Sequence, residues 1–413
     1  MKQTLAQKLV ARAAGRDSVT PGEIVTCKVD LAMMHDSGGP RRVKPMLERL
    51  GAKVWDPSKV VVITDHYVPT YDDESRKIIR IARDWVREAG IDNFYDEQGI
   101  CHVVLPERGH LRPGMFAVGG DSHSPTGGAF AAYMFGVGAT EMLGVLVTGE
   151  IWLKVPHTIV MDFEGALERG VSAKDAMLFL IGRFGMDGGE YQAIEYRGPA
   201  IRSLPMQERM TLCNMTAELG GQTGLIASDE TTAAYLGTKV EPWESDVGAP
   251  VLAHHHFNAS ELAPQVAAPH SPANAKPVDE FLSVKPTVAY IGACTGAKLA
   301  DLRMAASVLR GRKAKMRLMV APASARDVKA AEEEGTLAVL RDAGAEFLGL
   351  GCGICAGYGG NVLGENVVAI STTARNFKGR MGAPSSQVFL ASPYTVAATA
   401  VAGRICDPRE LLH

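Results

Sequence analysis

Four apolar runs in the sequence each end in a small turn that presents a chemically reactive side chain. Such runs, rich in branched side chains and alternating with helical periodicity, are typical of a parallel α/β fold. In open α/β sheets, ligands bind beyond the carboxyl ends of the strands. The recurrence therefore predicts an α/β protein whose functional site gathers side chains from several strand ends. The runs and the residues that follow them are 60–64 before Asp65 and His66, 116–118 before Asp121, Ser122 and His123, 287–291 before Cys294, and 347–350 before Cys352.

The chain has 413 residues, which indicates two or three domains rather than one. We expect an N-terminal α/β block over residues 1–283 and a further α/β domain over residues 284–413. Residues 249–277 are rich in Pro, Ala, Ser and His and lack a clear period, so they predict an extended connection at the end of the block. The C-terminal domain is predicted to alternate strands at 287–291, 316–320 and 347–350 with helices near 299–309 and 326–340.

The charge balance and hydropathy argue against nucleic-acid and membrane partners. The formal net charge is −3, so no basic field would attract polyanions, and no apolar run is long enough to span a bilayer. Residues 1–16 are basic and faintly resemble an organelle transit peptide. Because Leu5, Leu9 and Ala13 share one helical face, the segment instead favours a surface helix.

Seven cysteines are spread thinly along the chain, and an odd count in this pattern does not indicate a disulfide framework. It predicts a reducing compartment and a cytoplasmic location. We expect Cys27, Cys213 and Cys406 to be core or turn residues.

The pair Cys352 and Cys355 forms a C-x-x-C motif that is ambiguous by itself. Such a pair can be a redox couple, half of a zinc site, part of an iron–sulfur site or a structural feature. Cys294 follows its own predicted strand in the same domain, so the three thiols could converge at one sheet edge. Three thiolates without a fourth would leave one iron of a [4Fe-4S] cluster open as a Lewis acid. The spacing leaves the cluster and the redox or structural pair both open.

Carboxylate and imidazole side chains recur at the strand ends of the N-terminal block, as Asp65, His66, His102, Asp121 and His123. A carboxylate beside an imidazole raises its basicity and fixes its tautomer. Removal of water from a hydroxy acid needs a general acid near the departing hydroxyl and a base at the adjacent carbon. The set is therefore a candidate for acid–base chemistry.

Three further groups are weaker signals. Asn214 and Glu218 stand four residues apart and would share a helix face, which could equally be a solvated face. Arg375 and Arg380 could bind carboxylates but could also lie on the surface. The tract at 254–256 consists of three consecutive histidines, which rarely chelate one ion because neighbours point in different directions, so we interpret it as part of the connection.

Together these motifs resemble the aconitase superfamily of iron–sulfur hydro-lyases, and within it the large subunits of the 3-isopropylmalate dehydratase and homoaconitase type. The resemblance covers nearly the whole chain. It implies a three-domain α/β/α architecture around a central cluster, with two intertwined domains in residues 1–283 and without the family's swivelling fourth domain. The motifs that carry it are 4–15, Asp65-His66, Gly99-Ile-Cys-His102, Gly120-Asp-Ser-His123, Cys213-Asn-Met-Thr-Ala-Glu218, Ala293-Cys-Thr295, Gly351-Cys-Gly-Ile-Cys355, Arg375-Asn-Phe-Lys-Gly-Arg380 and Leu390-Ala-Ser-Pro393.

The resemblance also implies residue roles. Two positions depart from the family: Gly296 stands where an asparagine usually follows Cys-Thr, and Ala374 stands where an asparagine usually precedes the first arginine. Both positions would lie close to cluster or substrate. The implied roles are cluster ligands for Cys294, Cys352 and Cys355, carboxylate–histidine pairs for Asp65 with His66, Asp121 with His102 and Glu218 with His123, and substrate binding for Ser122, Asn214, Arg375 and Arg380.

The family's catalytic serine lies in a Gly-Ser-Ser-Arg-Glu type loop on the swivelling domain, and this sequence has no such loop. We therefore expect a second, smaller polypeptide to carry the serine. The expected reaction converts a substituted malate through a cis-enedioate, with 3-isopropylmalate, homocitrate, homoaconitate or a dimethylmalate as substrate. The alternatives are a thiol redox protein that uses only Cys352 and Cys355, and an RNA-binding relative, which the acidic balance disfavours.

Overall fold

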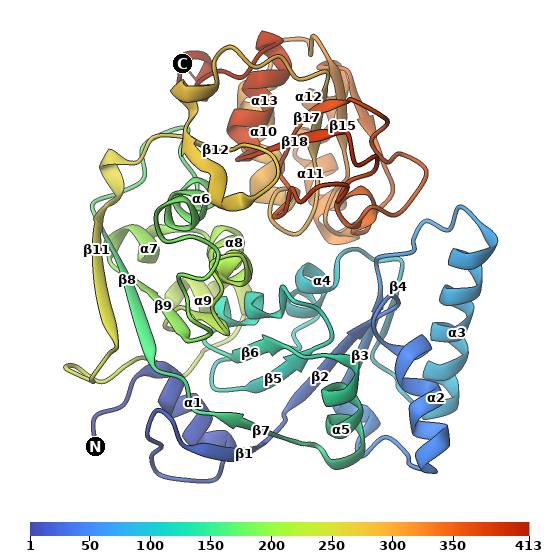
Figure 1. Ribbon diagram of the computed structural model, residues 1–413, viewed down its shortest axis with the longest axis vertical. Coiled ribbons are helices and arrows are strands. Elements are labelled where there is room, and N and C mark those ends of the chain that lie inside the picture. Colours follow the sequence, from blue (N-terminus) through green and yellow to red (C-terminus); the bar gives the residue numbers. More distant parts are fainter. Residues whose placement is uncertain (413) are drawn as a thin grey trace.

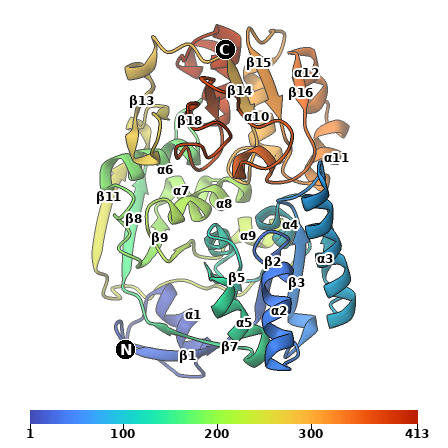
Figure 2. The same cartoon turned by 45° about the vertical axis from the view of Figure 1, so that its right-hand side comes forward.

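The structure of the chain, a computed structural model, describes residues 1–412. Figure 1 shows the C-terminal part stacked on a wider N-terminal part, and Figure 2 shows the same division from a second side. Within the described residues, no helix has both the length and the apolar character needed to cross a membrane.

The first sheet has five parallel strands in the order β4-β3-β2-β5-β6. All five residues of β3 are buried, as expected for a strand covered on both faces. Its strands are β2 (Leu31–His35), β3 (Val60–Thr64), β4 (Phe94–Asp96), β5 (Phe116–Gly119) and β6 (Tyr133–Gly136), with helices α2 (Pro40–Leu50), α3 (Asp73–Ala89), α4 (Cys101–Glu107) and α5 (Ala139–Thr148).

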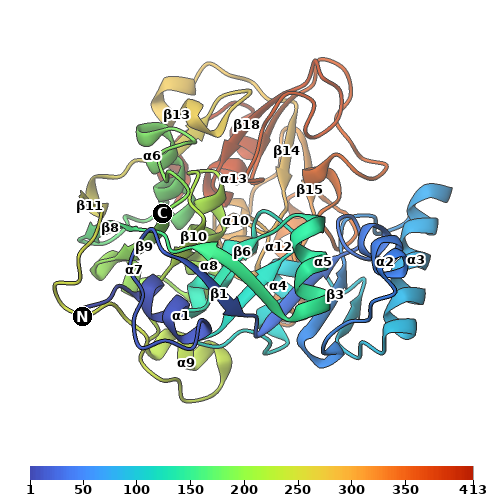
Figure 3. The same cartoon turned by 60° about the horizontal axis from the view of Figure 1, so that its bottom comes forward.

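An N-terminal helix and a two-stranded ribbon close the bottom of this sheet and come forward in Figure 3. Helix α1 (Leu5–Ala13) starts at a capping box in which Thr4 and Gln7 satisfy each other's backbone N–H groups. The predicted helix is present, but most of its residues are buried, so it is not a surface helix. Strand β1 (Ile24–Lys28) pairs antiparallel with β7 (Glu150–Lys154).

The second sheet has four parallel strands in the order β10-β9-β8-β11. Its strands are β8 (Thr158–Glu164), β9 (Ala193–Arg197), β10 (Thr223–Leu225) and β11 (Ala253–Asn258), with helices α6 (Ala173–Phe184), α7 (Pro199–Ser203), α8 (Met206–Asn214) and α9 (Glu230–Leu236).

The third sheet has seven strands in the order β13-β12-β18-β17-β14-β15-β16, in which β12 pairs antiparallel with both β18 and β13 and the other pairs are parallel. Its strands are β12 (Gln265–Ala267), β13 (Ala275–Pro277), β14 (Val288–Ile291), β15 (Arg317–Val320), β16 (Ala345–Phe347), β17 (Val368–Ser371) and β18 (Gln387–Ala391), with helices α10 (Leu299–Leu309), α11 (Ala325–Glu333), α12 (Thr336–Asp342) and α13 (Pro393–Ala402).

Three expectations are corrected. Residues 249–277 are not simply an extended connection, because β11 joins the second sheet and β12 and β13 join the third. The helix predicted over 326–340 is two helices, since Gly335 adopts a left-handed conformation with φ of 81° between α11 and α12. The strand predicted at 347–350 lies at 345–347, so a longer loop leads to Cys352.

The N- and C-terminal parts share one core. The largest group of buried apolar side chains includes Met33 of β2, Met161 of β8 and Met319 of β15, one from each main sheet. Backbone hydrogen bonds also join the parts, since Ile100 N–H donates to Ala323 O and Ala325 N–H donates to Gln98 O. This junction holds the strand ends of the first sheet against the loops of the third.

Candidate active site

A cavity of about 340 Å³ lies where the strand ends of the first sheet meet the loops of the third. The structure brings most of the sequence-predicted residues to its wall, and Asn214 and Glu218 lie behind that wall. The predicted residues that line it are Asp65, His66, His102, Asp121, Ser122, His123, Cys294, Cys352, Cys355, Arg375 and Arg380.

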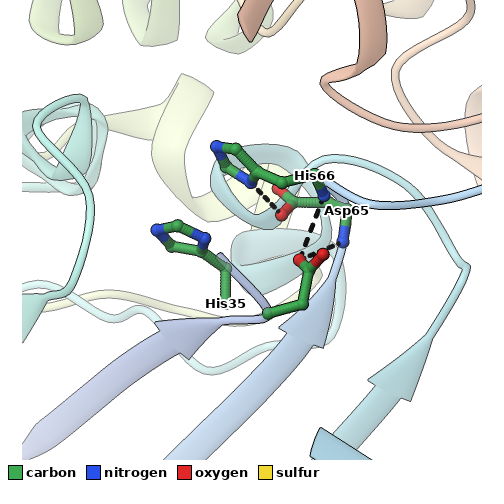
Figure 4. Close-up of side chains that lie close together, drawn as sticks. His35, Asp65 and His66 are labelled. Carbon is green, nitrogen blue, oxygen red and sulfur yellow. Dashed lines mark hydrogen bonds and ion pairs between the residues drawn. The ribbon is translucent and has the colours of Figure 1, made fainter. Parts of the chain in front are cut away.

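The first carboxylate–histidine pair follows β3 (Figure 4). His66 Nδ1 lies 2.6 Å from Asp65 Oδ1, and the other Asp65 oxygen accepts the Cys101 N–H at 2.8 Å. Burial of the His66 ring opposes its protonation, but the carboxylates of Asp65, Asp36 and Asp121 outweigh burial and raise the pKa of His66 to about 10. The pair can therefore hold a proton at neutral pH.

The second and third pairs share one network. His102 Nε2 lies 2.8 Å from Asp121 Oδ1, and the same oxygen accepts the His123 N–H at 2.8 Å. His123 Nε2 lies 2.9 Å from Glu218 Oε1, which also accepts the Arg375 Nε–H at 2.6 Å. Burial opposes protonation of the His123 ring, but Glu218 and Asp121 together outweigh burial and raise the pKa of His123 to about 9. All three pairings implied by the family resemblance are present as contacts.

The three cysteines reach the cavity from two loops. Cys294 follows β14, while Cys352 directly precedes a short 3-10 helix, Gly353–Ala356, that contains Cys355. A hydrogen bond from the Cys352 thiol, together with nearby positive charges that include Arg380, lowers the pKa of Cys355 to about 6. Burial raises the pKa of Cys294 to about 12. The Cys352 N–H donates to the Asp65 carbonyl at 2.6 Å, which ties this loop to the first pair.

The donor set of the cavity fits an iron–sulfur cluster. All seven cysteines are free, and among the described residues only these three thiols line the cavity. Asn214 Nδ2 donates to the Cys294 sulfur at 3.2 Å, an orientation that suits a sulfur with negative charge. Thiolates are the usual protein ligands of such clusters, and a set of three leaves one iron without a protein ligand.

Two arginines bring positive charge to the cavity. Arg375 is anchored through Nε to Glu218, and Arg380 Nε donates to the Cys355 carbonyl at 2.9 Å. Only one nitrogen of each guanidinium is used in these bonds, so the remaining N–H groups are available for a carboxylate. An acid with two or more carboxylates would fit this charge.

Two weak sequence signals are resolved by the structure, one by burial and one by strand pairing. Asn214 and Glu218 are 1% and 0% exposed, so they do not form a solvated face. Helix α8 ends at Asn214, and a short 3-10 turn over Met215–Ala217 carries the chain to Glu218. The tract at 254–256 is likewise not a connection, because it forms part of strand β11.

Of the two positions that depart from the family resemblance, Ala374 lies in the cavity wall, and Gly296 lies two residues after Cys294, behind that wall. A Cβ built on Gly296 would overlap the side chain of Thr372, so the close approach of Thr372 requires glycine there. Lys298, completely buried, donates from Nζ to the Cys294 carbonyl at 2.9 Å and to Asp301 at 2.7 Å. Ala374 lines the cavity beside Arg375.

Sequence reasoning missed the contribution of β2. His35 stacks on His66 with ring centroids 4.1 Å apart, and its Nε2 lies 3.0 Å from the Gly120 carbonyl (Figure 4). Asp36 accepts the backbone N–H groups of residues 65–67 and so shapes the turn after β3. The signal was available, since the apolar run 31–34 ends in His35-Asp36 and repeats the pattern of the other strands. Arg42 and Tyr358 also line the cavity.

Comparisons with known proteins find the aconitase family both in a family profile and among similar sequences. A sequence profile of the aconitase family (aconitate hydratase) matches residues 7–403. The 3-isopropylmalate dehydratase large subunit 1 of Methanopyrus kandleri is 43% identical over 419 residues and covers 100% of both chains. The probable methanogen homoaconitase large subunit of Methanosarcina mazei is 45% identical over 388 residues, which are 93% of this chain and 99% of that protein.

One solved structure supports the fold alone. The crystal structure of Thermococcus kodakaraensis aconitase X in its holo-form matches with a TM-score of 0.50 and 13% identity, and the match covers 85% of this chain and 84% of that one.

Proposed function

The chain belongs to the aconitase family of hydro-lyases, and we propose that it is the large subunit of an enzyme that dehydrates and rehydrates a substituted malate through a cis-enedioate. The substrate that we propose first is 3-isopropylmalate. The single observation that carries the proposal is the convergence of three thiols, three carboxylate–histidine pairs and two arginines on one cavity.

The family implies an iron–sulfur cluster, and we propose a [4Fe-4S] cluster held by Cys294, Cys352 and Cys355. When bound, the cluster supplies a Lewis acid at its open iron, which polarises the C–O bond of the substrate hydroxyl. The amide of Asn214 would neutralise part of the charge on Cys294.

The proposed roles of the chain's own side chains follow from their contacts. His102, oriented by Asp121, donates a proton toward the departing hydroxyl and takes it back during rehydration. His123 and Glu218 position Arg375, and Arg375 and Arg380 bind the substrate carboxylates. His66 and Asp65 form a charged pair beside Cys352, whose N–H donates to the Asp65 carbonyl, so the pair helps to position the Cys352 loop. Ser122 lies in the cavity wall within reach of a bound acid.

We propose that a small subunit supplies the swivelling domain and the serine that removes the carbon-bound proton. The relatives named above are called large subunits, and one matches this chain over its full length. Two halves that close over the substrate would also exclude water from the site. A cytoplasmic location is part of the proposal, since the seven free cysteines fit a reducing compartment.

Homoaconitase activity is the second candidate, because a methanogen homoaconitase large subunit is as similar as the dehydratase subunits. The substrates of homoaconitase and of 3-isopropylmalate dehydratase differ in the group attached to the malate. A panel that contains 3-isopropylmalate, homocitrate, homoaconitate and a dimethylmalate would separate them.

The experiment is an anaerobic assay of the cluster-loaded chain with that panel, in the presence and absence of the candidate small subunit. We expect turnover of one malate only when both chains are present. Robust turnover by the isolated chain would show that the base lies in this chain, with Ser122 or His66 as candidates. A loaded two-chain complex that turns over none of the panel would contradict the proposed reaction.

A further inference from the structure

A group of histidine and aspartate side chains, residue types that can ligate metals, lies on the outer edge of the molecule, away from the cavity. Strand β11 is an edge strand of the second sheet and, within residues 1–412, pairs with β8 alone (Figures 1 and 2). His254 and His256 are two residues apart on β11 and therefore project from the same face of the sheet. His256 pairs in register with Asp162 of β8, which places a carboxylate on that face.

The three side chains are already close together. His254 Nε2 lies 3.1 Å from Asp162 Oδ2, and the rings of His254 and His256 have centroids 4.1 Å apart. One ligand atom from each residue can be chosen such that all three lie within 4.8 Å of one another. The other oxygen of Asp162 is buried and has no hydrogen-bond partner among residues 1–412, so this carboxylate has unused capacity to accept.

We propose that Asp162, His254 and His256 form a binding site for a divalent transition-metal ion, with Zn²⁺ as the best match. Two imidazoles and a carboxylate are a common zinc donor set, with metal–ligand distances of about 2.0–2.2 Å. The ligand atoms lie within 4.8 Å of one another, so small rotations of the exposed rings would bring all three to that distance from one shared ion. The fourth position is open to water, because both histidines are exposed. Imidazole donors favour zinc, nickel and copper over magnesium and calcium.

A bound ion would have a structural consequence. The ion would link side chains of β11 to a side chain of β8, in addition to the backbone pairing that joins the two strands. Because an ion that binds only the folded state stabilises that state, zinc should raise the midpoint of thermal unfolding.

The neighbouring histidine offers a matched control. His255 projects from the opposite face of β11, where its ring packs on Phe184 with centroids 4.8 Å apart. The substitution His255→Ala therefore changes the same type of residue in the same strand without touching the proposed donors.

The test is equilibrium dialysis of the full, anaerobically purified chain against Zn²⁺, with the natural chain compared with His254→Ala, His256→Ala, Asp162→Asn and His255→Ala. Any zinc held by cysteines is common to all five proteins. We expect the first three variants to bind one zinc ion fewer per chain, or at least tenfold more weakly at one site. His255→Ala should bind as the natural chain does.

Thermal unfolding provides a second measurement on the same proteins. Zn²⁺ should raise the unfolding midpoint of the natural chain and of His255→Ala, while Mg²⁺ should not. Equal zinc stoichiometry and equal thermal shifts in the natural chain and in a His254→Ala/His256→Ala double variant would overturn the proposal.

Discussion

Gly296 packs directly against Thr372, and no side chain can be added to the glycine without overlap with the Cβ and Oγ1 of the threonine. Thr372 cannot easily move away. Its hydroxyl accepts the Gly292 N–H at 2.8 Å and donates to the Gly292 carbonyl at 2.8 Å, which fixes it between the ends of β14 and β17. Glycine at position 296, where the family usually has asparagine, therefore leaves the space that the Thr372 side chain occupies.

We predict that Gly296→Asn, which restores the residue usual in the family, destabilises this chain. The added atoms must displace Thr372 and break its two hydrogen bonds, which should lower the free energy of unfolding by about 1–3 kcal/mol or more. The measurement is the unfolding midpoint in denaturant. Gly144→Ala is the control, since Gly144 is exposed within α5 with open space around its Cα, and alanine there should stabilise by about 0.5–1 kcal/mol. A Gly296→Asn variant as stable as the natural chain would contradict the packing argument.

We predict that Glu218→Gln lowers turnover of the two-chain complex by about two to four orders of magnitude, the usual scale for groups in acid–base catalysis. The neutral amide would no longer hold the charges of His123 and Arg375, which both contact Glu218 Oε1. Iron content should not change, because Glu218 contacts none of the three cysteines in the hydrogen bonds of the site.

A matched control is Glu195→Gln. Glu195 is also buried, but it accepts hydrogen bonds from Arg197 of its own strand β9 and from Ser245, and it does not line the cavity. Its substitution should leave turnover within about twofold when it is assayed well below the unfolding temperature. Near-natural turnover in Glu218→Gln would remove this residue from the proposed mechanism.

The junction between the two parts should depend on pH through Glu107. Burial and the nearby Asp327 raise the pKa of Glu107 from its ordinary 4.5 to about 7, while Ser324 donates to its carboxylate at 2.7 Å. The folded chain therefore binds a proton more tightly than the unfolded chain. Between about pH 4.5 and 7, the contribution of Glu107 to the free energy of unfolding should fall as pH rises, by up to about 3 kcal/mol.

The variant Glu107→Gln cannot ionise at this position, so its unfolding midpoint should rise relative to that of the natural chain over the same pH range and should exceed it at pH 8. The measurement is thermal unfolding from pH 5 to pH 8. Parallel pH profiles for the natural chain and the variant would contradict the assignment.

Much of the architecture follows from local patterns. The buried run at 60–64 and the helix at 299–309 have the bounds predicted for them, because burial on both faces and helical periodicity are properties of the segment itself. Strands β12 and β13 were not predicted. Each has three residues, too few for a pattern, and they form because Val266 and Ala267 pair with β18 far along the chain. Such pairing is decided by tertiary contacts.

The sequence predicted most of the residues of the candidate site but not which of these residues contact one another. Motifs gave the carboxylates, histidines, arginines and thiols, but spacing could not show that Glu218 contacts both His123 and Arg375, since these residues are 95 and 157 positions away. His35 was missed because its strand was not recognised. The tract at 254–256 was misread because polar residues on an exposed edge strand have the composition of a loop.

The redox alternative makes a different prediction for Cys294. A pair that acts through Cys352 and Cys355 alone would not need a third thiol, whereas the proposed cluster needs all three. In this structure Asn214 donates to Cys294, which lines the same cavity as the other two. The behaviour of Cys294 therefore separates the two accounts.

The most direct test of the proposed site is the iron content of the chain after anaerobic reconstitution, measured for the natural sequence and for Cys294→Ser. The natural chain should hold about four irons, as expected for a [4Fe-4S] cluster, and should absorb visible light. Controls are alanine substitutions of Cys27, Cys213 and Cys406, which are buried away from the cavity and should leave the iron unchanged. We predict that Cys294→Ser loses most of its iron and colour, and full iron loading in that variant would contradict the proposed cluster site.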